Sequence, residues 1–121
     1  MENIVTITLL YLTLLGNIEM TSFEIPSKES CESWFHYNVK VKENKRDQLK
    51  EYLQTKGIPS MIYYPIPLYY QEAFSGYVSK SFKLENTEVL CKEVLSLPMH
   101  SELKSETQEK IIFQIKEFFN A

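Results

Sequence analysis

The sequence predicts an α+β fold, in which a small sheet has helices packed on one face. The chain has 121 residues, 44% hydrophobic and 24% charged, an ordinary globular composition with room for one small domain. Short runs of β-branched and aromatic residues alternate with segments whose apolar residues recur at i, i+3 and i+4. Because this strand–helix order repeats in so short a chain, a few strands covered by helices are favoured.

The most apolar stretch of the chain, residues 4–15, comes first. It is shorter than the roughly 20 residues of a membrane-spanning helix. It also lacks the basic start of a signal peptide, so we expect it to pack on protein. Its β-branched residues favour a strand, whereas Tyr11, Leu14 and Leu15 would share one face of a helix. The sequence leaves both structures open.

Residues 34–42 are predicted to form a strand, because apolar and polar residues alternate in its second half. The next helix is expected to be capped by Asn44 and to carry Asp47 in its first turn, where the helix dipole favours a carboxylate. Gly57 is placed to end this helix in the left-handed conformation. The apolar stripe predicted between these ends is Leu49, Tyr52 and Leu53.

A second strand is predicted over residues 60–64, after Pro59 prevents the helix from continuing. Tyr63 and Tyr64 would point to opposite faces of this strand, so we expect one of them in the core. Two prolines then end the strand, a short helix is predicted over residues 68–74, and a polar loop over residues 75–83.

The last third of the chain is predicted to contain two helices with a short strand between them. Asn86 would cap the first helix, whose apolar residues would be Val89, Leu90 and Val94. Glu85 and Glu88, near its start, would complement the helix dipole. The strand, residues 94–97, ends at Pro98. Ser105 and Gln108 form a capping box for the final helix. Its predicted apolar face is Ile111, Ile112, Ile115, Phe118 and Phe119.

Charge and cysteine content exclude two classes of function. The net charge is −3 and Arg46 is the one arginine, whereas a surface that follows nucleic-acid phosphates needs a basic excess. Cys31, Cys91, His36 and His100 do not have the spacing of a zinc site. We therefore expect no metal, no nucleic-acid partner, and two reduced thiols. Nothing in the sequence supports a disulfide between the two cysteines.

Five short motifs follow one another at residues 46–49 (RDQL), 57–58 (GI), 63–68 (YYPIPL), 71–74 (QEAF) and 95–100 (LSLPMH). The ordered set resembles the C-terminal domain of the DegT/DnrJ/EryC1/StrS family. These are pyridoxal-phosphate-dependent aminotransferases that act on nucleotide-linked keto-sugars. The resemblance implies that residues 33–121 form the small C-terminal domain of a fold-type I aminotransferase. It implies that residues 1–32 are an apolar segment and linker, the remnant of an interdomain helix.

The resemblance implies pyridoxal phosphate as the cofactor of the intact enzyme. In the family, the lysine that holds the cofactor, the carboxylate for its ring nitrogen and the phosphate cradle lie on a larger N-terminal domain. Lys80 and Lys83 lie in a segment that faintly resembles the family's cofactor-lysine segment, but no glycine pair follows it. We expect both to be solvated loop lysines. We therefore expect no catalytic residue and no bound cofactor in this chain alone.

The segment after YYPIPL contacts the nucleotide-sugar in the family, which points to Tyr69, Tyr70 and Gln71 as substrate-binding residues. Tyr64, within the motif, is the fourth candidate, because one of the two neighbouring strand tyrosines would face the cleft. Many relatives have a histidine where this chain has Tyr69. A phenol can donate a hydrogen bond to a phosphate or sugar oxygen and stack on a ring, but it cannot carry a positive charge as histidine can. The competing interpretation is that these residues only pack at the end of a proline-stiffened strand. His100, at a strand end, is expected to make a local hydrogen bond.

Two hypotheses of function follow. In the first, the chain is the C-terminal fragment of a sugar aminotransferase of polysaccharide or modified-sugar biosynthesis, inactive alone, with an exposed apolar surface where the larger domain docks. In the second, it is a stand-alone α+β module that binds a nucleotide-sugar or a partner protein. The expected partners are a nucleotide-sugar in the intact enzyme and the larger domain or a second copy of the chain. We expect a cytoplasmic location and no membrane association.

Overall fold

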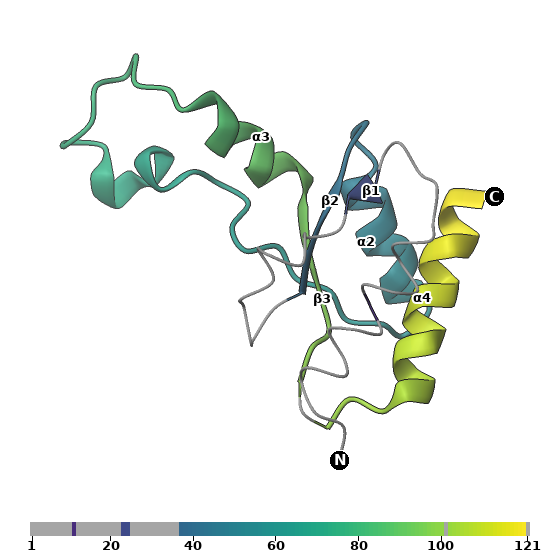
Figure 1. The fold of residues 1–121 in the computed structure, drawn as a ribbon. Coiled ribbons are helices and arrows are strands. Elements are labelled where there is room, and N and C mark those ends of the chain that lie inside the picture. Colours follow the sequence, from purple (N-terminus) through teal and green to yellow (C-terminus); the bar gives the residue numbers. More distant parts are fainter. Residues whose placement is uncertain (1–10, 12–22, 25–36, 101, 121) are drawn as a thin grey trace.

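A small antiparallel sheet with two helices on one face forms the body of the molecule (Figure 1). The computed structural model describes residues 11, 23–24, 37–100 and 102–120. In this part of the chain the strands lie in the order β1 (Phe23–Glu24), β2 (Tyr37–Val41) and β3 (Val94–Leu97). Helices α2 (Arg46–Thr55) and α4 (Ser105–Asn120) pack against each other beside the sheet. The predicted fold class is confirmed.

The core lies between these two helices and one face of the sheet. Val39 of β2 is paired directly with Leu95 of β3, and Tyr37 with Leu97, so all four share that face. Asn38 and Lys40 alternate with them and are exposed. The predicted helix faces are confirmed, because the helices contribute the buried side chains of Leu49, Leu53, Ile111, Ile112 and Ile115. Tyr52, Phe118 and Phe119 are partly buried against this core.

Helix α2 ends as predicted but begins differently. Gly57 has a φ of 75°. Its N–H donates to the Gln54 carbonyl at 3.0 Å, and the Ile58 N–H donates to the Leu53 carbonyl at 2.9 Å. These two bonds form a Schellman motif, which satisfies carbonyls at the helix end. At the other end, the prediction of Asn44 as the cap was wrong. The cap is Lys45, with no side-chain cap hydrogen bond, and Asn44 takes a left-handed φ of 56° in the preceding turn.

The prediction of a strand over residues 60–64 was also wrong. Only Met61 pairs with the sheet, through one antiparallel bridge to Ser96 of β3. Tyr63 and Tyr64 are both exposed, so neither side chain enters the core. After the bridge the chain leaves the sheet, and residues 62–64 pair with no strand in the described part of the chain.

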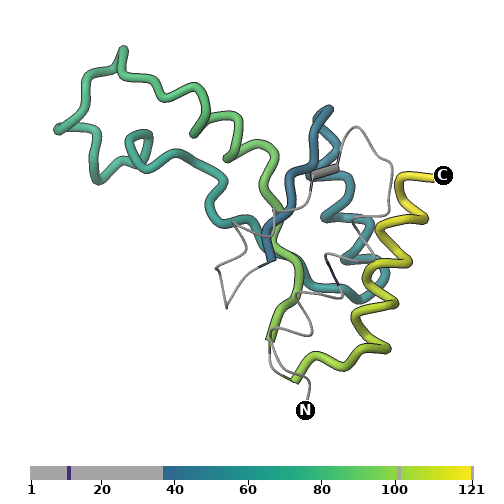
Figure 2. Tube along the Cα trace, viewed as in Figure 1, coloured from purple at the N-terminus to yellow at the C-terminus, as the bar shows by residue number. Residues whose placement is uncertain are grey.

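Residues 63–93, called the arm below, extend away from the body and return to it at β3 (Figures 1 and 2). The arm contains two short 3₁₀ turns, η1 (Leu68–Tyr70) and η2 (Glu72–Phe74), where one short helix was predicted. It then forms helix α3 (Glu85–Glu93). Asn86 does not cap α3, because the cap is Leu84 and the helix begins at Glu85. Val94 was predicted both on this helix and as the start of the strand over residues 94–97; it is the first residue of β3, which confirms the strand.

Tyr11 joins the N-terminal part of the chain to the core. Its backbone is helical and its side chain is fully buried. Its ring stacks on Tyr37 with centroids 4.7 Å apart, and its hydroxyl donates to the Pro98 carbonyl at 2.8 Å. The predictions for Leu14, Leu15, Trp34, His36 and Cys31 concern positions outside the described residues.

Candidate functional site

The base of the arm is tied to the body by Arg46, the first residue of α2. Its side chain is buried, and Nη1 donates to the Cys91 carbonyl at 2.5 Å and to the Val94 carbonyl at 3.5 Å. Its Nε donates to Asp47 Oδ1 at 2.9 Å. A guanidinium can satisfy several acceptors at once, and here it meets carbonyls of the last turn of α3 and the start of β3. The RD pair of the first motif thus holds the arm against the sheet.

Within the arm, two tyrosines of η1 meet one carboxylate of α3. The Tyr70 hydroxyl donates to Glu88 Oε1 at 2.7 Å, and the Tyr69 hydroxyl donates to the same oxygen at 3.1 Å. The backbone N–H of Leu84, the cap of α3, donates to the Tyr69 hydroxyl at 3.1 Å. The Tyr69 ring packs edge-on against Tyr70 and Phe82, with centroids 4.6 and 5.1 Å away. We call Tyr69, Tyr70 and Glu88 the tyrosine–glutamate cluster.

These hydrogen bonds shift the protonation equilibria of all three side chains. The hydrogen bond from Tyr70 is the largest cause lowering the pKa of Glu88, because it stabilises the carboxylate. The same bond raises the pKa of Tyr70 to about 12, because ionising the phenol would place two negative charges together. The pKa of Tyr69 is also raised, first by its partial removal from water and then by Glu88. At neutral pH the cluster is therefore two neutral phenols and one carboxylate.

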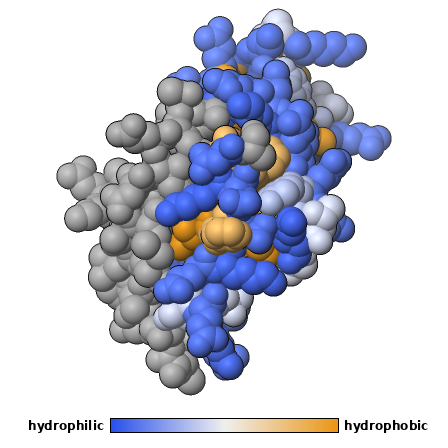
Figure 3. Space-filling view, turned by 90° about the vertical axis from the view of Figure 1, so that its right-hand side faces the viewer, coloured by the Kyte–Doolittle hydropathy of each residue, from blue (hydrophilic) through white to orange (hydrophobic). Residues whose placement is uncertain are grey.

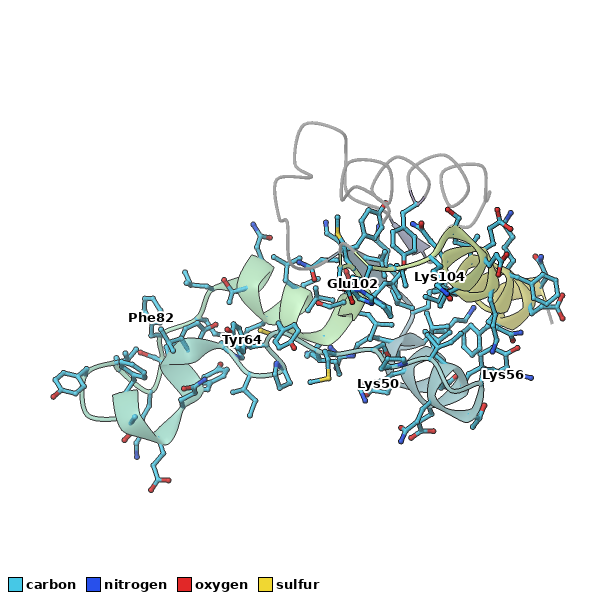
Figure 4. The ribbon with its side chains drawn as sticks, turned by 90° about the horizontal axis from the view of Figure 1, so that it is seen from below. Lys50, Lys56, Tyr64, Phe82, Glu102 and Lys104 are labelled. Carbon is cyan, nitrogen blue, oxygen red and sulfur yellow. The ribbon has the colours of Figure 1, made fainter. Side chains whose placement is uncertain are left out.

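The four predicted substrate-binding residues all lie in the outgoing half of the arm, before α3, but they do not form one cluster. Tyr69 and Tyr70 meet at the cluster, and Gln71 follows directly as an exposed residue. Tyr64 is 69% exposed and lies between Phe82 and the body of the molecule (Figure 4). Its ring contacts that of Tyr63, with centroids 5.9 Å apart. Their contact with substrate stays a prediction.

Glu88 is the residue of this cluster that sequence reasoning missed. The first turn of α3 does hold Glu85 and Glu88, as predicted, but Glu88 also accepts the two phenols. Its partners lie 18 and 19 residues earlier in the chain. No local periodicity links positions so far apart, so nothing in the printed sequence would have identified the contact.

The other described residues that the sequence offered for chemistry do not assemble into a site. Lys80 and Lys83 are exposed loop residues, as predicted, and His100 is exposed. Cys91 is a free, partly buried thiol. Among the described residues, no group of histidine, cysteine and carboxylate side chains could hold a metal ion. No helix in the same part of the chain is long and apolar enough to cross a membrane.

A shallow hollow of about 250 Å³ lies where the chain leaves the body towards the arm. It is lined mainly by apolar residues of the two segments that meet at the Met61 bridge: Pro59, Ser60, Met61, Tyr63, Ser96, Leu97, Pro98 and Met99. The Ser60 hydroxyl at its wall is buried and has no hydrogen-bond partner among the described residues. A buried hydroxyl without a partner costs about 1–3 kcal/mol, so a group that docked here could satisfy it.

The fold and the arm define the class of protein: an α+β domain of the kind found in aminotransferases. A solved structure, a DegT DnrJ EryC1 StrS aminotransferase from Brucella abortus, matches 98% of this chain and 31% of its own chain, with a TM-score of 0.81 and 34% identity. The model of the DegT/DnrJ/EryC1/StrS aminotransferase family matches residues 3–116. The chain belongs to this family, which confirms the resemblance.

Two curated relatives show how much of a family protein the chain represents. A pleiotropic regulatory protein of Geobacillus stearothermophilus is 36% identical over 94% of this chain and 30% of its own length. A dTDP-3-amino-3,6-dideoxy-alpha-D-galactopyranose transaminase of Aneurinibacillus thermoaerophilus is 32% identical over 70% of this chain and 22% of its own length. The chain therefore spans less than a third of these relatives.

The described lysines differ from a lysine that holds pyridoxal phosphate. The family is pyridoxal-phosphate-dependent, and one solved structure of the same fold, ntda from Bacillus subtilis, has bound cofactor PMP. That structure is 20% identical, with a TM-score of 0.85 over 95% of this chain and 27% of its own. A cofactor lysine needs an enclosed amine with a phosphate cradle beside it. Every described lysine is exposed or only half-buried, and Lys80 and Lys83 are among the exposed ones.

Proposed function

We propose that this chain forms the small C-terminal domain of a nucleotide-sugar aminotransferase, with residues 33–121 as the domain and residues 1–32 as the segment leading into it. In this proposal a larger domain holds pyridoxal phosphate, and the arm contributes Tyr64, Tyr69, Tyr70 and Gln71 to the substrate site. The reaction is amino transfer to a nucleotide-linked keto-sugar in cytoplasmic polysaccharide or modified-sugar synthesis. The chain alone is expected to be inactive, because its described residues lack a cofactor site.

The apolar surface of the arm is the observation that carries the proposal. Exposed large apolar side chains occupy most of its length: Tyr63, Tyr64, Ile66, Leu68, Tyr70, Phe74, Tyr77, Phe82, Leu84, Val89 and Leu90. The face on the α4 side is mainly hydrophilic, with small apolar areas between polar side chains (Figure 3). A high density of exposed apolar side chains on one part of a small domain is typical of an interface.

Two further features support a domain interface as the purpose of the arm. The chain spans about 30% of its first relative, so a family protein has a larger part that could cover this surface. The unpartnered Ser60 hydroxyl lies by the hollow at the base of the arm, where the same docking could satisfy it. Arg46 and the tyrosine–glutamate cluster hold the arm in place before any partner binds.

The proposal is tested by combining the chain with the part of a relative that it lacks. The Aneurinibacillus thermoaerophilus transaminase, shortened by the segment that this chain matches, would be co-expressed with the 121-residue chain and assayed for amino transfer. We expect co-purification and restored activity, which Leu68→Glu on the arm abolishes and Phe113→Glu on α4 does not. Failure to associate, or activity unaffected by Leu68→Glu, would contradict the proposal.

A second measurement addresses the cofactor directly. The chain alone is mixed with pyridoxal phosphate and followed by its absorbance. We expect the spectrum of the free cofactor. A new band that borohydride fixes to a single lysine would show that the chain holds the cofactor by itself, contrary to the proposal.

The self-contained core of the domain favours one alternative, a stand-alone module that binds a nucleotide-sugar or a protein. Most of its core residues come from β2, α2, β3 and α4, and all of them are buried within this chain. This alternative expects saturable binding of a uridine-nucleotide sugar by the chain alone. A flat calorimetric titration, together with restored activity in the mixing experiment, would exclude it.

A further inference from the structure

We infer that Glu88 is a positioning residue, which turns the Tyr69–Tyr70 pair into a subsite for hydrogen-bond donors such as sugar hydroxyls and not for phosphate. This inference rests on the proposed function, since it names the part of the substrate that the arm receives. It is carried by the direction of the hydrogen bonds in the cluster.

Each phenol has one proton to donate and can accept hydrogen bonds at its oxygen. Tyr70 directs its proton to Glu88 Oε1 at 2.7 Å, and Tyr69 directs its proton to the same oxygen at 3.1 Å, with the Leu84 carbonyl as a more distant second acceptor at 3.4 Å. Neither phenol then has a proton left for a ligand. A phosphate oxygen only accepts hydrogen bonds, so it would have to break one of these bonds, whereas a sugar hydroxyl can donate without disturbing them.

The atoms that remain available in the cluster are acceptors. The Tyr69 oxygen already receives the Leu84 N–H at 3.1 Å, while Tyr70 is 50% exposed and its oxygen has no donor among the described residues. The second carboxylate oxygen, Glu88 Oε2, also has no hydrogen-bond partner in the described part of the chain. A ligand at the cluster therefore meets two acceptors without donors, the Tyr70 oxygen and Glu88 Oε2, a pattern that matches neighbouring hydroxyl groups on a sugar ring.

The charges around the cluster do not reverse its preference for hydrogen-bond donors over phosphate. Lys83 and Lys92 lie near enough to help lower the pKa of Glu88, and Glu85 adds a second carboxylate to the first turn of α3. With two cations and two anions in this region, no net positive charge favours phosphate. The edge-on packing of Tyr69 against Tyr70 and Phe82 holds the hydroxyl groups in fixed positions.

The first test measures whether Glu88 receives these protons. The side-chain carboxyl carbons of the 121-residue chain are observed by ¹³C NMR during an acid titration. In Tyr70→Phe, the pKa of Glu88 should rise towards its ordinary value, because the largest cause of its depression is lost. Tyr77→Phe is the matched control, since Tyr77 is 87% exposed and makes no contact with the cluster. An unchanged Glu88 titration in Tyr70→Phe would overturn the inference.

The second test compares two probes, a neutral methyl hexoside and inorganic pyrophosphate. At about 1–10 mM, the affinity range of a few hydrogen bonds, the hexoside should shift the NMR signals of Tyr70, and pyrophosphate should not. Glu88→Gln removes the charge and replaces Oε2, an acceptor, by an NH₂ group that donates, so the preference for the hexoside should fall about tenfold, the scale of one charge-assisted hydrogen bond. Glu85→Gln, in the same helical turn but outside the cluster, should keep it.

Equal or stronger perturbation by pyrophosphate, or no response of Tyr70 to either probe, overturns the inference. These outcomes are separate from the proposed function, which the mixing experiment tests through restored amino transfer. If the NMR probes showed a preference for pyrophosphate and the mixing experiment still restored activity, the proposed function would stand. The arm would then contact the nucleotide part of the substrate and not the sugar. Failure of the mixing experiment would refute the domain proposal, while the NMR readouts would still report the polarity of the cluster.

Discussion

At the residue scale, Arg46 is expected to contribute more to the stability of the domain than a charged residue at the start of a helix usually does. Its guanidinium is buried and reaches carbonyls of both α3 and β3. The Lys45–Glu43 ion pair, one residue away, lies on the surface at 3.1 Å. Exposed ion pairs contribute little to stability, whereas a buried guanidinium leaves several acceptors without donors when it is removed.

We therefore predict that Arg46→Ala lowers the free energy of unfolding by about 2–4 kcal/mol, and that Arg46→Lys recovers only part of this loss because an ammonium lacks the planar fork. Urea denaturation measures both values. Lys45→Ala serves as the control and should change stability by less than about 1 kcal/mol. A similar loss in Lys45→Ala and Arg46→Ala would show that the buried contacts have no special role.

Because of Tyr11, the free energy of unfolding of the domain depends on pH in the alkaline range. Burial is the main cause that raises the pKa of its phenol well above the ordinary value of 10.0. In the unfolded chain the phenol ionises near pH 10, while in the folded chain it stays protonated. Its stabilising contribution is therefore complete below pH 10 and is lost as the pH rises above it.

We predict that the free energy of unfolding falls between about pH 10 and 11.5, and that Tyr11→Phe makes this fall shallower. At neutral pH the same variant should cost about 0.5–1.5 kcal/mol, because the hydrogen bond to the Pro98 carbonyl is lost. Chemical denaturation at a series of pH values measures both effects. The exposed Tyr77→Phe is the control, and an equal flattening there would assign the effect to the wrong residue.

At the element scale, the end of α2 depends on one glycine. Gly57 has a φ of 75°, a conformation that side chains with a β-carbon adopt at a cost. A β-carbon placed there would have no neighbour within 4 Å, so the cost of a substitution is conformational and not steric. The Schellman bonds of the helix end depend on this conformation.

Gly57→Ala should therefore destabilise the domain by about 1–2 kcal/mol, and Gly57→Asn by less, because asparagine tolerates the left-handed region. Gly76 makes a matched control, since its φ lies outside that region and its surroundings are also open. Gly76→Ala should be neutral or stabilise by up to about 1 kcal/mol through the unfolded state. Thermal unfolding compares the three variants, and an equal loss in both alanine variants would contradict this explanation.

Elements were predictable from sequence where local periodicity decides burial. The alternation through Val39 and the helical spacing of Ile112 and Ile115 identified β2 and α4, and both pack as expected. The caps were less predictable, because asparagine suits both a helix cap and a left-handed turn, and Asn44 takes the second role. Residues 60–64 have strand-like composition, but whether a strand forms depends on a partner far away in the chain, and only Met61 finds one.

At the scale of the whole molecule, the arm concentrates the exposed apolar surface on one projection. We predict that the isolated chain associates as its concentration rises, and that Leu68→Glu combined with Val89→Glu reduces this association. Both positions are exposed, so the free energy of unfolding should change little. Analytical ultracentrifugation measures the association. Phe113→Glu, at a residue of α4 that is 56% exposed, is the control and should leave the association unchanged.

The candidate site was predictable only in part, for a reason that also belongs to this scale. The motifs indicated Tyr69 and Tyr70, and the structure brings them together. The partner that orders them, Glu88, comes from the returning half of the arm after a long excursion. Contacts across such a loop depend on its closure, which neither composition nor spacing encodes at a single position.

The bridge between Met61 and Ser96 makes it possible to observe local opening at the base of the arm. The two residues exchange backbone hydrogen bonds, from Met61 N–H at 3.1 Å and from Ser96 N–H at 2.7 Å, and no adjoining pair extends the ladder. Both amide protons are therefore released by the same local opening. Their hydrogen–deuterium exchange should therefore show similar protection factors in the closed form, and both factors should fall together when the arm detaches.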